Sequence, residues 1–353
     1  MPTVTYKCPN CDGGLLFDPE SQKFHCEYCN SSFTREELEQ GGDQNTEDSG
    51  KGASQETDEF DSHAVAYTCP SCGAEVVVED TTAATYCYYC HNPVVLSGRV
   101  SGKFRPERVV PFRISQKEVE EKFLSWCKKK KFMKRDFFSQ SQKEKLTGVY
   151  LPFWMLDCST RAFLRARGNK IRSWRSGNTQ YTETEEYEMI REGDIDFANL
   201  PLGALSRKEM ELTRGIAPYD MKQAQDFSMA YLSGFQAEKR NLEKEEVEPE
   251  AQKQLEEYTK SVLCDTIVGY SGVTVQQVNH HNTWEKWRYT MLPVWVMTYR
   301  YRDKSYYYAM NGQTGKAVSY THLFDKEREL ETSEMMCPAL LFICDYVLNN
   351  TRF

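Results

Sequence analysis

The stretches Cys8-Pro9-Asn10-Cys11 and Cys26-Glu27-Tyr28-Cys29 decide the N-terminal fold, and both return as Cys69-Pro70-Ser71-Cys72 and Cys87-Tyr88-Tyr89-Cys90. Each copy has fourteen residues between its two cysteine pairs, and the offset from Cys8 to Cys69 is 61 positions. Two residues between cysteines let a tight turn aim both sulfurs at one point, and two such turns complete a tetrahedron around Zn²⁺. The sequence therefore predicts two zinc ribbons that hold one ion each. The predicted ligands are Cys8, Cys11, Cys26, Cys29, Cys69, Cys72, Cys87 and Cys90.

The alternatives for these cysteines are disulfides or coincidence, and a repeat in register argues against both. His25 and His91 lie beside ligand cysteines and are alternative ligands, but next to four thiolates we expect them outside the coordination shell. A complete set of four thiolates leaves no position for water or substrate, so the sites should be structural. Each ribbon is too short for a self-sufficient core, and metal binding should supply on the order of 10 kcal/mol of its folding free energy.

Composition bounds the rest of the chain. A length of 353 residues suggests two or three domains, and 40% hydrophobic residues suffice for a sizeable core. A net charge of −8 argues against wholesale binding of a phosphate backbone. No signal peptide is visible at the start, and together with metal-type cysteine spacing this predicts a cytoplasmic protein. The other cysteines are expected to be buried thiols; they are Cys127, Cys158, Cys264, Cys337 and Cys344.

The N-terminal third is organised around the two copies. The first ribbon should carry strands near 15–17 and 23–25, and the second a strand near 75–78. The segment between them lacks periodicity and is rich in polar residues, so it is expected to be a flexible linker that lets the ribbons move independently. The predicted domains are ribbon 1 at 1–35, the linker at 41–63, ribbon 2 at 65–96 and a larger domain at 104–316.

The larger domain shows both helical and strand-like patterns. Ser115 and Glu118 form a capping box for an amphipathic helix over 117–131. Polar segments predict two more helices, with a break near Pro249 and an apolar stripe of core residues. These helices should span 218–246 and 250–263, and the stripe comprises Phe227, Tyr231, Leu232 and Phe235. Strands are expected at 146–157, 160–167, 170–175, 179–190, 272–279, 284–301 and 304–310. The fold class is α+β, with two small ribbons before an antiparallel sheet packed by helices.

A basic region follows the first of these helices. Residues 101–175 hold 20 basic and 7 acidic side chains, which makes this the one plausible anionic-partner surface. The candidate nucleic-acid or anion ligands are Lys128, Lys129, Lys130, Lys131, Lys134 and Arg135. The alternative is a solvated face whose cations complement the helix C-terminus. Cross-strand pairing of Arg161, Arg165 and Arg167 with the acidic run from Glu183 to Glu188 would satisfy further cations internally.

No catalytic residue is predicted. The chain contains no GxxxxGK[ST], GxGxxG, HExxH or GxSxG motif. His280 and His281 stand between asparagines and are expected in a polar turn between strands. We therefore expect a non-enzymatic, zinc-binding protein-interaction module. The alternatives are a nucleic-acid-binding zinc-ribbon protein and an enzyme of unknown reaction in the larger domain.

The last segment, 317–353, is atypical. Strand patterning fails after Lys316, and Ala317 to Leu323 looks like a translated transposase mosaic-end adapter, with an ordinary linker as the alternative. We expect this tail to be non-native and poorly packed. Its apolar run over 335–348 is too short and interrupted to span a membrane.

The paired CPxC turns, the strands Tyr150–Trp154 and Met291–Trp295, and the closing Tyr306–Lys316 resemble a group of bacterial proteins, mostly from Firmicutes. These are described as TFIIB-type zinc-ribbon-containing proteins, some labelled as similar to the PriA helicase. The resemblance covers nearly all of 1–316 and implies metal ligation by the eight cysteines. Helicase activity does not carry over, because no nucleotide-binding loop exists here. Group members commonly continue into a hydrophobic C-terminal helix, which implies membrane anchoring of a full-length natural form; this sequence departs there.

Overall fold

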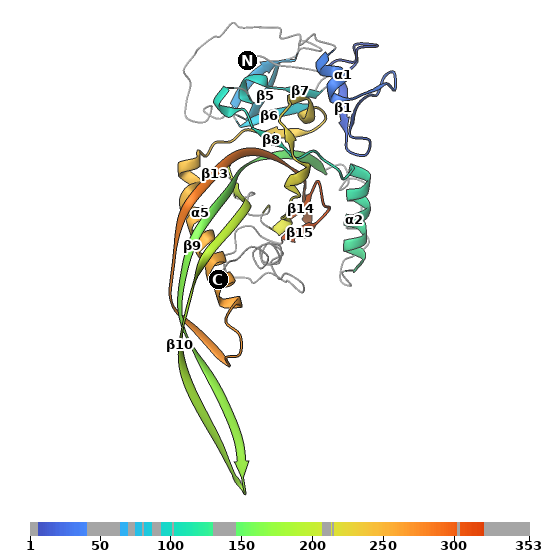
Figure 1. Cartoon of the computed structure of the whole chain (residues 1–353). Coiled ribbons are helices and arrows are strands. Elements are labelled where there is room, and N and C mark those ends of the chain that lie inside the picture. The colour runs from blue at the N-terminus through green and yellow to red at the C-terminus, as the bar shows by residue number, and fades with distance from the viewer. Residues whose placement is uncertain are drawn as a thin grey trace. The chain divides into compact units, whose positions relative to one another are not determined.

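The computed structural model describes residues 6–40, 64–69, 75–79, 81–86, 93–100, 102–129, 146–206, 213, 215–301 and 304–320 (Figure 1). The described residues fall into two compact units. Those within 1–153, 203–242 and 288–332 form the first unit, and those within 154–202 and 243–287 form the second. The fold is α+β: a small three-stranded sheet precedes a ten-stranded sheet with few helices.

The small sheet has the order β1-β2-β3 and is antiparallel throughout. Its strands are Leu15–Asp18, Lys23–Cys26 and Ser32–Phe33, which confirms the strands predicted for the first ribbon. Helix α1 (Arg35–Gln40) follows, and Thr34 caps it. The Thr34 N–H donates to Glu37 Oε2 at 2.7 Å, and the Glu37 N–H donates to Thr34 Oγ1 at 3.4 Å. These two bonds form the reciprocal capping box that starts short helices.

The first ribbon is docked on other segments of the first unit, contrary to the prediction that it moves independently. The Phe17 N–H donates to the Ser233 carbonyl at 3.1 Å, and the rings of Phe17 and Tyr231 lie edge to face with centroids 5.2 Å apart. Gln22 Nε2 donates to the carbonyl of Phe112 at 2.7 Å. Alternate residues of β1 are buried, and a hairpin this small gains a core by docking on a larger surface.

The second cysteine-bearing segment is divided between two sheets. Strands β4 (Ala64–Thr68) and β5 (Glu75–Glu79) pair as a two-stranded sheet. Strands β6 (Thr82–Tyr86) and β7 (Pro93–Val95) instead form one edge of the ten-stranded sheet. Strand β6 joins this sheet by pairing with β12 (Gln236–Glu238), so the second cysteine-bearing segment is not a separate domain.

The ten-stranded sheet has the main order β11-β8-β13-β9-β12-β6-β7; β10 pairs with β9, β14 with β13, and β15 with β14. Most neighbours are antiparallel, whereas β12 with β9 and β13 with β8 are parallel. The remaining strands are β8 (Arg108–Val109), β9 (Thr147–Ser176), β10 (Thr179–Gly203), β11 (Gln225–Asp226), β13 (Gly272–Tyr301), β14 (Lys304–Asn311) and β15 (Ala317–Tyr320). Strand β15 corrects the expectation that strand pairing ends at Lys316, and 321–353 lies outside the described residues.

The predicted breaks within the long strands are wrong. Strand β13 runs through 279–282, where a polar turn was expected. Its polar side chains find partners on β9: Thr160 Oγ1 donates to Asn282 Oδ1 at 2.8 Å, and Thr283 Oγ1 donates to the Ser159 carbonyl at 3.0 Å. These cross-strand bonds give the Asn282 carbonyl oxygen and the Thr283 hydroxyl partners within the sheet, so these polar residues can be accommodated in a continuous strand.

The segment from Pro218 to Glu238, predicted as helix, is mostly irregular. It contains the short 3-10 turns η4 (Met221–Gln223) and η5 (Met229–Leu232) between β11 and β12. Asp220 and Ser228 cap these turns by accepting main-chain N–H bonds, and such local bonds compete with a continuous helix. The predicted stripe is still core, since its four members are all buried: Phe227, Tyr231, Leu232 and Phe235.

Helices α2 (Gln116–Lys129) and α5 (Lys244–Asp265) are the longest helices among the described residues. Helix α2 begins as predicted, with the Glu118 N–H bonded to Ser115 Oγ at 3.5 Å. Helix α5 continues through Pro249, so the expected break there is wrong. Its buried residues fall at helical spacing and anchor both sides of the proline; they are Val247, Ala251, Leu255, Thr259, Val262 and Leu263. Two 3-10 turns, η1 (Ser97–Arg99) and η2 (Gly102–Phe104), link β7 to β8.

Four aromatic rings pack together within the core of the first unit. Phe112 stacks on Phe235 with centroids 4.1 Å apart and meets Tyr150 and Trp295 edge to face at 5.0 and 5.2 Å. Tyr150 and Trp295 come from the stretches Tyr150–Trp154 and Met291–Trp295, which share the Leu-Pro-x-Trp pattern, and the structure places these stretches in neighbouring strands β9 and β13. Offset and edge-to-face contacts of this kind add to the burial of the rings.

Candidate metal centre

The first cysteine pair is held by a turn with two main-chain hydrogen bonds. The Cys8 N–H donates to the Gly13 carbonyl at 2.7 Å, and the Asp12 N–H donates to the Cys8 carbonyl at 2.9 Å. Asp12 adopts a left-handed backbone with φ 60°. Aspartate tolerates this conformation better than most residues, which lets the chain reverse directly after Cys11.

The second pair repeats this geometry position by position. The Cys26 N–H donates to the Ser31 carbonyl at 2.9 Å, the Asn30 N–H donates to the Cys26 carbonyl at 2.9 Å, and Asn30 has φ 57°. Pairing of Leu15 with Cys26 across β1 and β2 brings the two turns to one end of the hairpin. The sequence thus builds two matching turns whose sulfurs face each other.

The four sulfurs of this cluster have a spacing suited to a metal ion. Cys8 Sγ and Cys29 Sγ lie 3.5 Å apart, as do Cys11 Sγ and Cys26 Sγ, and all four lie within 4.8 Å of one another. A Zn–S bond of about 2.3 Å gives a tetrahedron whose sulfur–sulfur edges are about 3.8 Å. The observed separations bracket that edge, and none of the four cysteines is in a disulfide. The cluster could therefore hold a metal ion.

The protein environment favours one thiolate and opposes others. A hydrogen bond with the Ser31 side chain, followed by the Ser31 N–H, lowers the pKa of Cys29 to about 6. Burial raises the pKa of Cys8. The Gly13 N–H lowers the pKa of Cys11, but the neighbouring Cys29 and Cys26 sulfurs outweigh it and raise the value to about 12. A cation bound among the sulfurs would displace the remaining protons, since metal ligation requires thiolates.

The histidines fall outside this group of sulfurs. His25 Nδ1 pairs with Ser32 Oγ at 3.3 Å, and the metal-capable group found among the described residues consists of the four cysteines. His91 lies outside the described residues. In the second unit, His280 Nε2 lies 3.0 Å from Gln252 Oε1 on α5.

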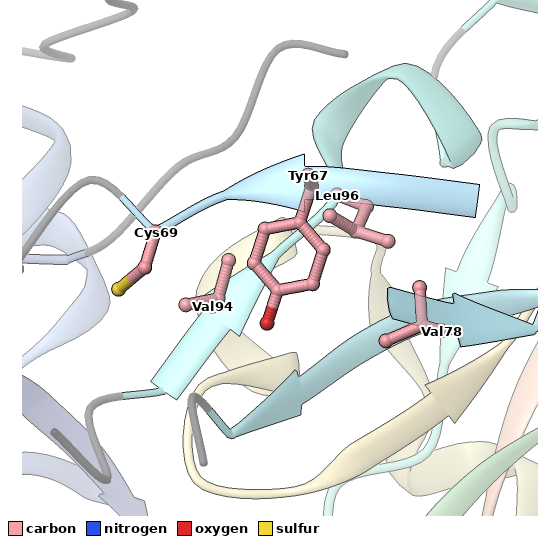
Figure 2. Packing of buried hydrophobic residues seen from close by; sticks show 5 residues of the cluster. All are labelled: Tyr67, Cys69, Val78, Val94 and Leu96. Carbon is pink, nitrogen blue, oxygen red and sulfur yellow. The ribbon is translucent and has the colours of Figure 1, made fainter. Parts of the chain in front are cut away.

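The second copy is described in part. Cys69 is buried at the end of β4, whereas Cys72, Cys87 and Cys90 lie outside the described residues. Figure 2 shows Cys69 beside Tyr67, with its sulfur turned away from the rest of the cluster; the other members are Val78, Val94 and Leu96. Tyr67 and Cys69 are the repeat partners of Tyr6 and Cys8. In the second copy the repeated Tyr-x-Cys motif is therefore part of a buried hydrophobic cluster.

The strand register repeats along with the cysteines. In the first copy Phe24 pairs with Phe33 and His25 with Ser32. Adding 61 to each number gives the observed pairs Thr85 with Val94 and Tyr86 with Pro93 between β6 and β7. The strands that flank the second turn of each copy therefore pair identically.

The predicted anion-binding residues lie at and after the end of helix α2. Lys128 and Lys129 end helix α2, but their side chains, and all of 130–135, lie outside the described residues. The predicted internal pairing of cations is confirmed in part in the second unit: Arg165 Nε lies 2.6 Å from Glu188 Oε1, whereas Arg161 Nε lies 3.1 Å from Asp194 Oδ1, which is outside the predicted acidic run.

Sequence reasoning missed a cleft beside the first ribbon. It has a volume of about 440 Å³, and the residues that line it include Glu27, Tyr28 and Tyr86. Burial, with a smaller contribution from the Glu27 carboxylate, raises the pKa of Tyr86 to about 12. Glu27 and Tyr28 occupy the two positions between Cys26 and Cys29, and that placement was the one signal in the sequence that could have drawn attention to them.

These features define an α+β protein of two compact units with an N-terminal four-cysteine cluster able to hold a metal. No helix in the described part of the chain is long and apolar enough to cross a membrane. No protein-family model and no solved structure matches the sequence. The chain is 35% identical over 315 residues to a Bacillus subtilis (strain 168) protein described as "Uncharacterized protein YdjG", a match that covers 89% of each chain. It belongs to the same family as YdjG.

Proposed function

We propose that this protein is a zinc-binding interaction module in which two four-cysteine ribbons, one ion in each, are carried on a non-catalytic α+β platform. The cluster of Cys8, Cys11, Cys26 and Cys29 carries the proposal, because its spacing fits tetrahedral thiolate coordination. Soft thiolate ligands favour zinc over hard cations such as Mg²⁺ and Ca²⁺.

The proposal of a second ion rests on the repeat. The cysteines of both copies have equal spacing, and the strands that flank the second turn have the same register at an offset of 61. A backbone that pairs identically on both sides of Cys87 and Cys90 would present those sulfurs as the first copy presents Cys26 and Cys29. Cys69, which stands 61 positions after Cys8 in the repeat, is buried as Cys8 is.

A structural role for both ions follows from the ligand set. Four thiolates fill a tetrahedral coordination shell, whereas catalytic zinc keeps one position for water or substrate. The ions would fix the turns, and the turns would fix the surface between the cysteines. In the first copy that surface includes Tyr28, whose side chain is 72% exposed. An exposed aromatic ring suits recognition of a protein partner.

Cytoplasmic localisation and membership of the TFIIB-type zinc-ribbon group are part of the same proposal. Metal-type cysteine spacing supports the first, since a reducing compartment keeps eight such thiols available. The paired CPxC turns support the second.

Metal analysis of the purified full-length chain tests this function. We expect two zinc ions per chain, and one ion for either Cys11→Ser or Cys90→Ser. Cys158→Ser is the matched control, because Cys158 is a buried cysteine outside both motifs and should leave both ions in place. A cobalt-substituted sample should show the absorption of tetrahedral thiolate coordination. Zinc-free protein, or a Cys90→Ser variant that keeps two ions, would contradict the proposal. Affinity capture with the wild type and with a variant that combines Cys11→Ser and Cys90→Ser then tests whether partner binding needs the ribbons.

A further inference from the structure

The cleft beside the first ribbon is built from segments far apart in the sequence. All of its lining residues belong to the first unit. The ribbon supplies Leu16, Pro19, Glu27 and Tyr28, and strands β6 and β7 supply Tyr86 and Pro93. These apolar and aromatic groups surround a volume of about 440 Å³, which is within the range of small-ligand and side-chain pockets.

Of the two tyrosine rings of the cleft, Tyr28 lies against Gly13 and Tyr86 is held by a hydrogen bond. The ring of Tyr28 lies so close over Gly13 that a Cβ added at Gly13 would stand 2.5 Å from Tyr28 Cδ2. The Tyr86 hydroxyl donates a hydrogen bond to the carbonyl of Gly234. A ring that is held before a ligand arrives, as Tyr86 is, loses little conformational entropy on binding.

The charged side chain that lines the cleft is negative. Glu27 is the one ionisable acid or base besides the tyrosines among the lining residues that the structure describes, and its side chain is exposed. Aromatic faces attract cations through the ring quadrupole, and a carboxylate beside them adds Coulomb attraction. The same groups oppose an anionic ligand.

We propose that this cleft binds a lysine or arginine side chain of a partner protein, with the cationic head at Glu27 and the tyrosine rings. Pro19, Pro93 and Leu16 give the aliphatic stem of such a side chain an apolar wall. This inference rests on the proposed interaction function and deepens it: the partner segment recognised beside the first metal centre is basic. The position of Glu27 and Tyr28 between two ligand cysteines links the cleft to the metal, because the ion fixes the turn that carries both side chains.

A peptide selection on the full-length, zinc-loaded chain tests the idea. A phage-displayed library of random peptides is panned on the protein, and the affinity of a selected peptide is measured by fluorescence anisotropy. We expect enriched peptides to contain lysine or arginine. Glu27→Gln and Tyr28→Ala should each weaken binding about tenfold, and Tyr28→Phe should retain binding because it keeps the ring. Glu20→Gln is the matched control: Glu20 is an exposed acid of the same hairpin outside the cleft, and its removal should leave affinity unchanged.

Each other outcome overturns the inference. Failure to enrich peptides, enrichment of neutral or acidic peptides, or binding that is insensitive to Glu27→Gln would all contradict a cation site. Zinc content is measured for every variant, and it separates this inference from the function on which it rests. Two ions without basic-peptide binding would sink the cleft alone, whereas loss of metal from the wild type would sink the proposed function.

Discussion

The hydroxyl of Ser233 donates a hydrogen bond to the main-chain carbonyl of Leu15 and so joins the first ribbon to the segment before β12. Ser233 is 1% exposed, and its own carbonyl accepts from the Phe17 N–H. One residue therefore bonds to both ends of the Leu15–Phe17 stretch. The metal-bearing hairpin is docked by these bonds as well as by the apolar contacts of Phe17.

Ser233→Ala should weaken this docking. The substitution leaves the Leu15 carbonyl without its side-chain donor in a buried position, which costs about 1–3 kcal/mol. We expect a lower free energy of unfolding and faster amide exchange over Leu15–Phe17. Ser125→Ala removes a hydroxyl from the exposed face of α2 and is the control. Equal stability of the two variants would show that the bond is dispensable.

Gly312→Ala should destabilise the first unit strongly. A Cβ at Gly312 would stand 2.6 Å from Phe112 Cδ1 and 2.9 Å from Pro293 Cβ, so the aromatic core would have to shift. Overpacking of this kind costs about 1–3 kcal/mol. At Gly272 an added Cβ meets nothing within 4 Å, and Gly272→Ala should stay within about 0.5 kcal/mol of the wild type in a urea titration.

The ion pairs between β9 and β10 should contribute little to stability. Arg165 and Glu188 are about half exposed, and Arg161 and Asp194 more so. Exposed pairs contribute about 0–1 kcal/mol because solvent screens them. A double-mutant cycle of Arg165→Ala and Glu188→Ala should therefore give a coupling energy under about 1 kcal/mol, and a larger value would indicate a less solvated hairpin than the structure shows.

Alkaline pH should lower the free energy of unfolding, because buried thiol and phenol groups must ionise. Burial raises the pKa of the Cys158 thiol to about 11 and raises the pKa values of Tyr150 and Tyr289. A group whose pKa is higher in the folded state stabilises the fold below its unfolded pKa, and this stabilisation is lost as pH rises through the folded value. Stability should decline from about pH 9 for the thiol and from about pH 10 for the phenols. Urea titrations between pH 8 and 11 measure the decline, and Cys158→Ala should flatten its lower part.

The parts of this fold that the sequence predicted depend on local chemistry. The turns at Cys8 and Cys26 need only cysteine spacing and a residue such as Asp12 that accepts a left-handed backbone. The start of α2 needs only Ser115 and Glu118. Local chemistry also forms the turn at 311–315, where the Asn311 side chain accepts from the Gln313 and Thr314 N–H groups at 2.9 Å.

The errors came from long-range pairing, which no local pattern encodes. Strand β12 is three residues long and pairs with β9 on one side and β6 on the other, so it draws the second ribbon into the large sheet. The segment before β12 was predicted to be helical because Phe227, Tyr231 and Phe235 recur at helical spacing among polar residues. The structure buries the same three residues without a continuous helix. The Glu27–Tyr86 cleft was missed for the same reason: its walls meet in space and not in sequence.

Removal of metal should affect the two copies unequally. The sheet of β1, β2 and β3 has three short strands and a few docking contacts, so without an ion it loses most of what fixes its turns. Strand β6 is paired with β12 on one side and β7 on the other, and this pairing does not depend on the sulfurs. After treatment with a zinc chelator, amide exchange should rise strongly at Leu15–Cys26 and only modestly at Thr82–Tyr86. Readdition of zinc should restore protection in both segments. Equal loss of protection would mean that β6 relies on the metal as much as the first ribbon does, and that its place in the large sheet is not self-sustaining.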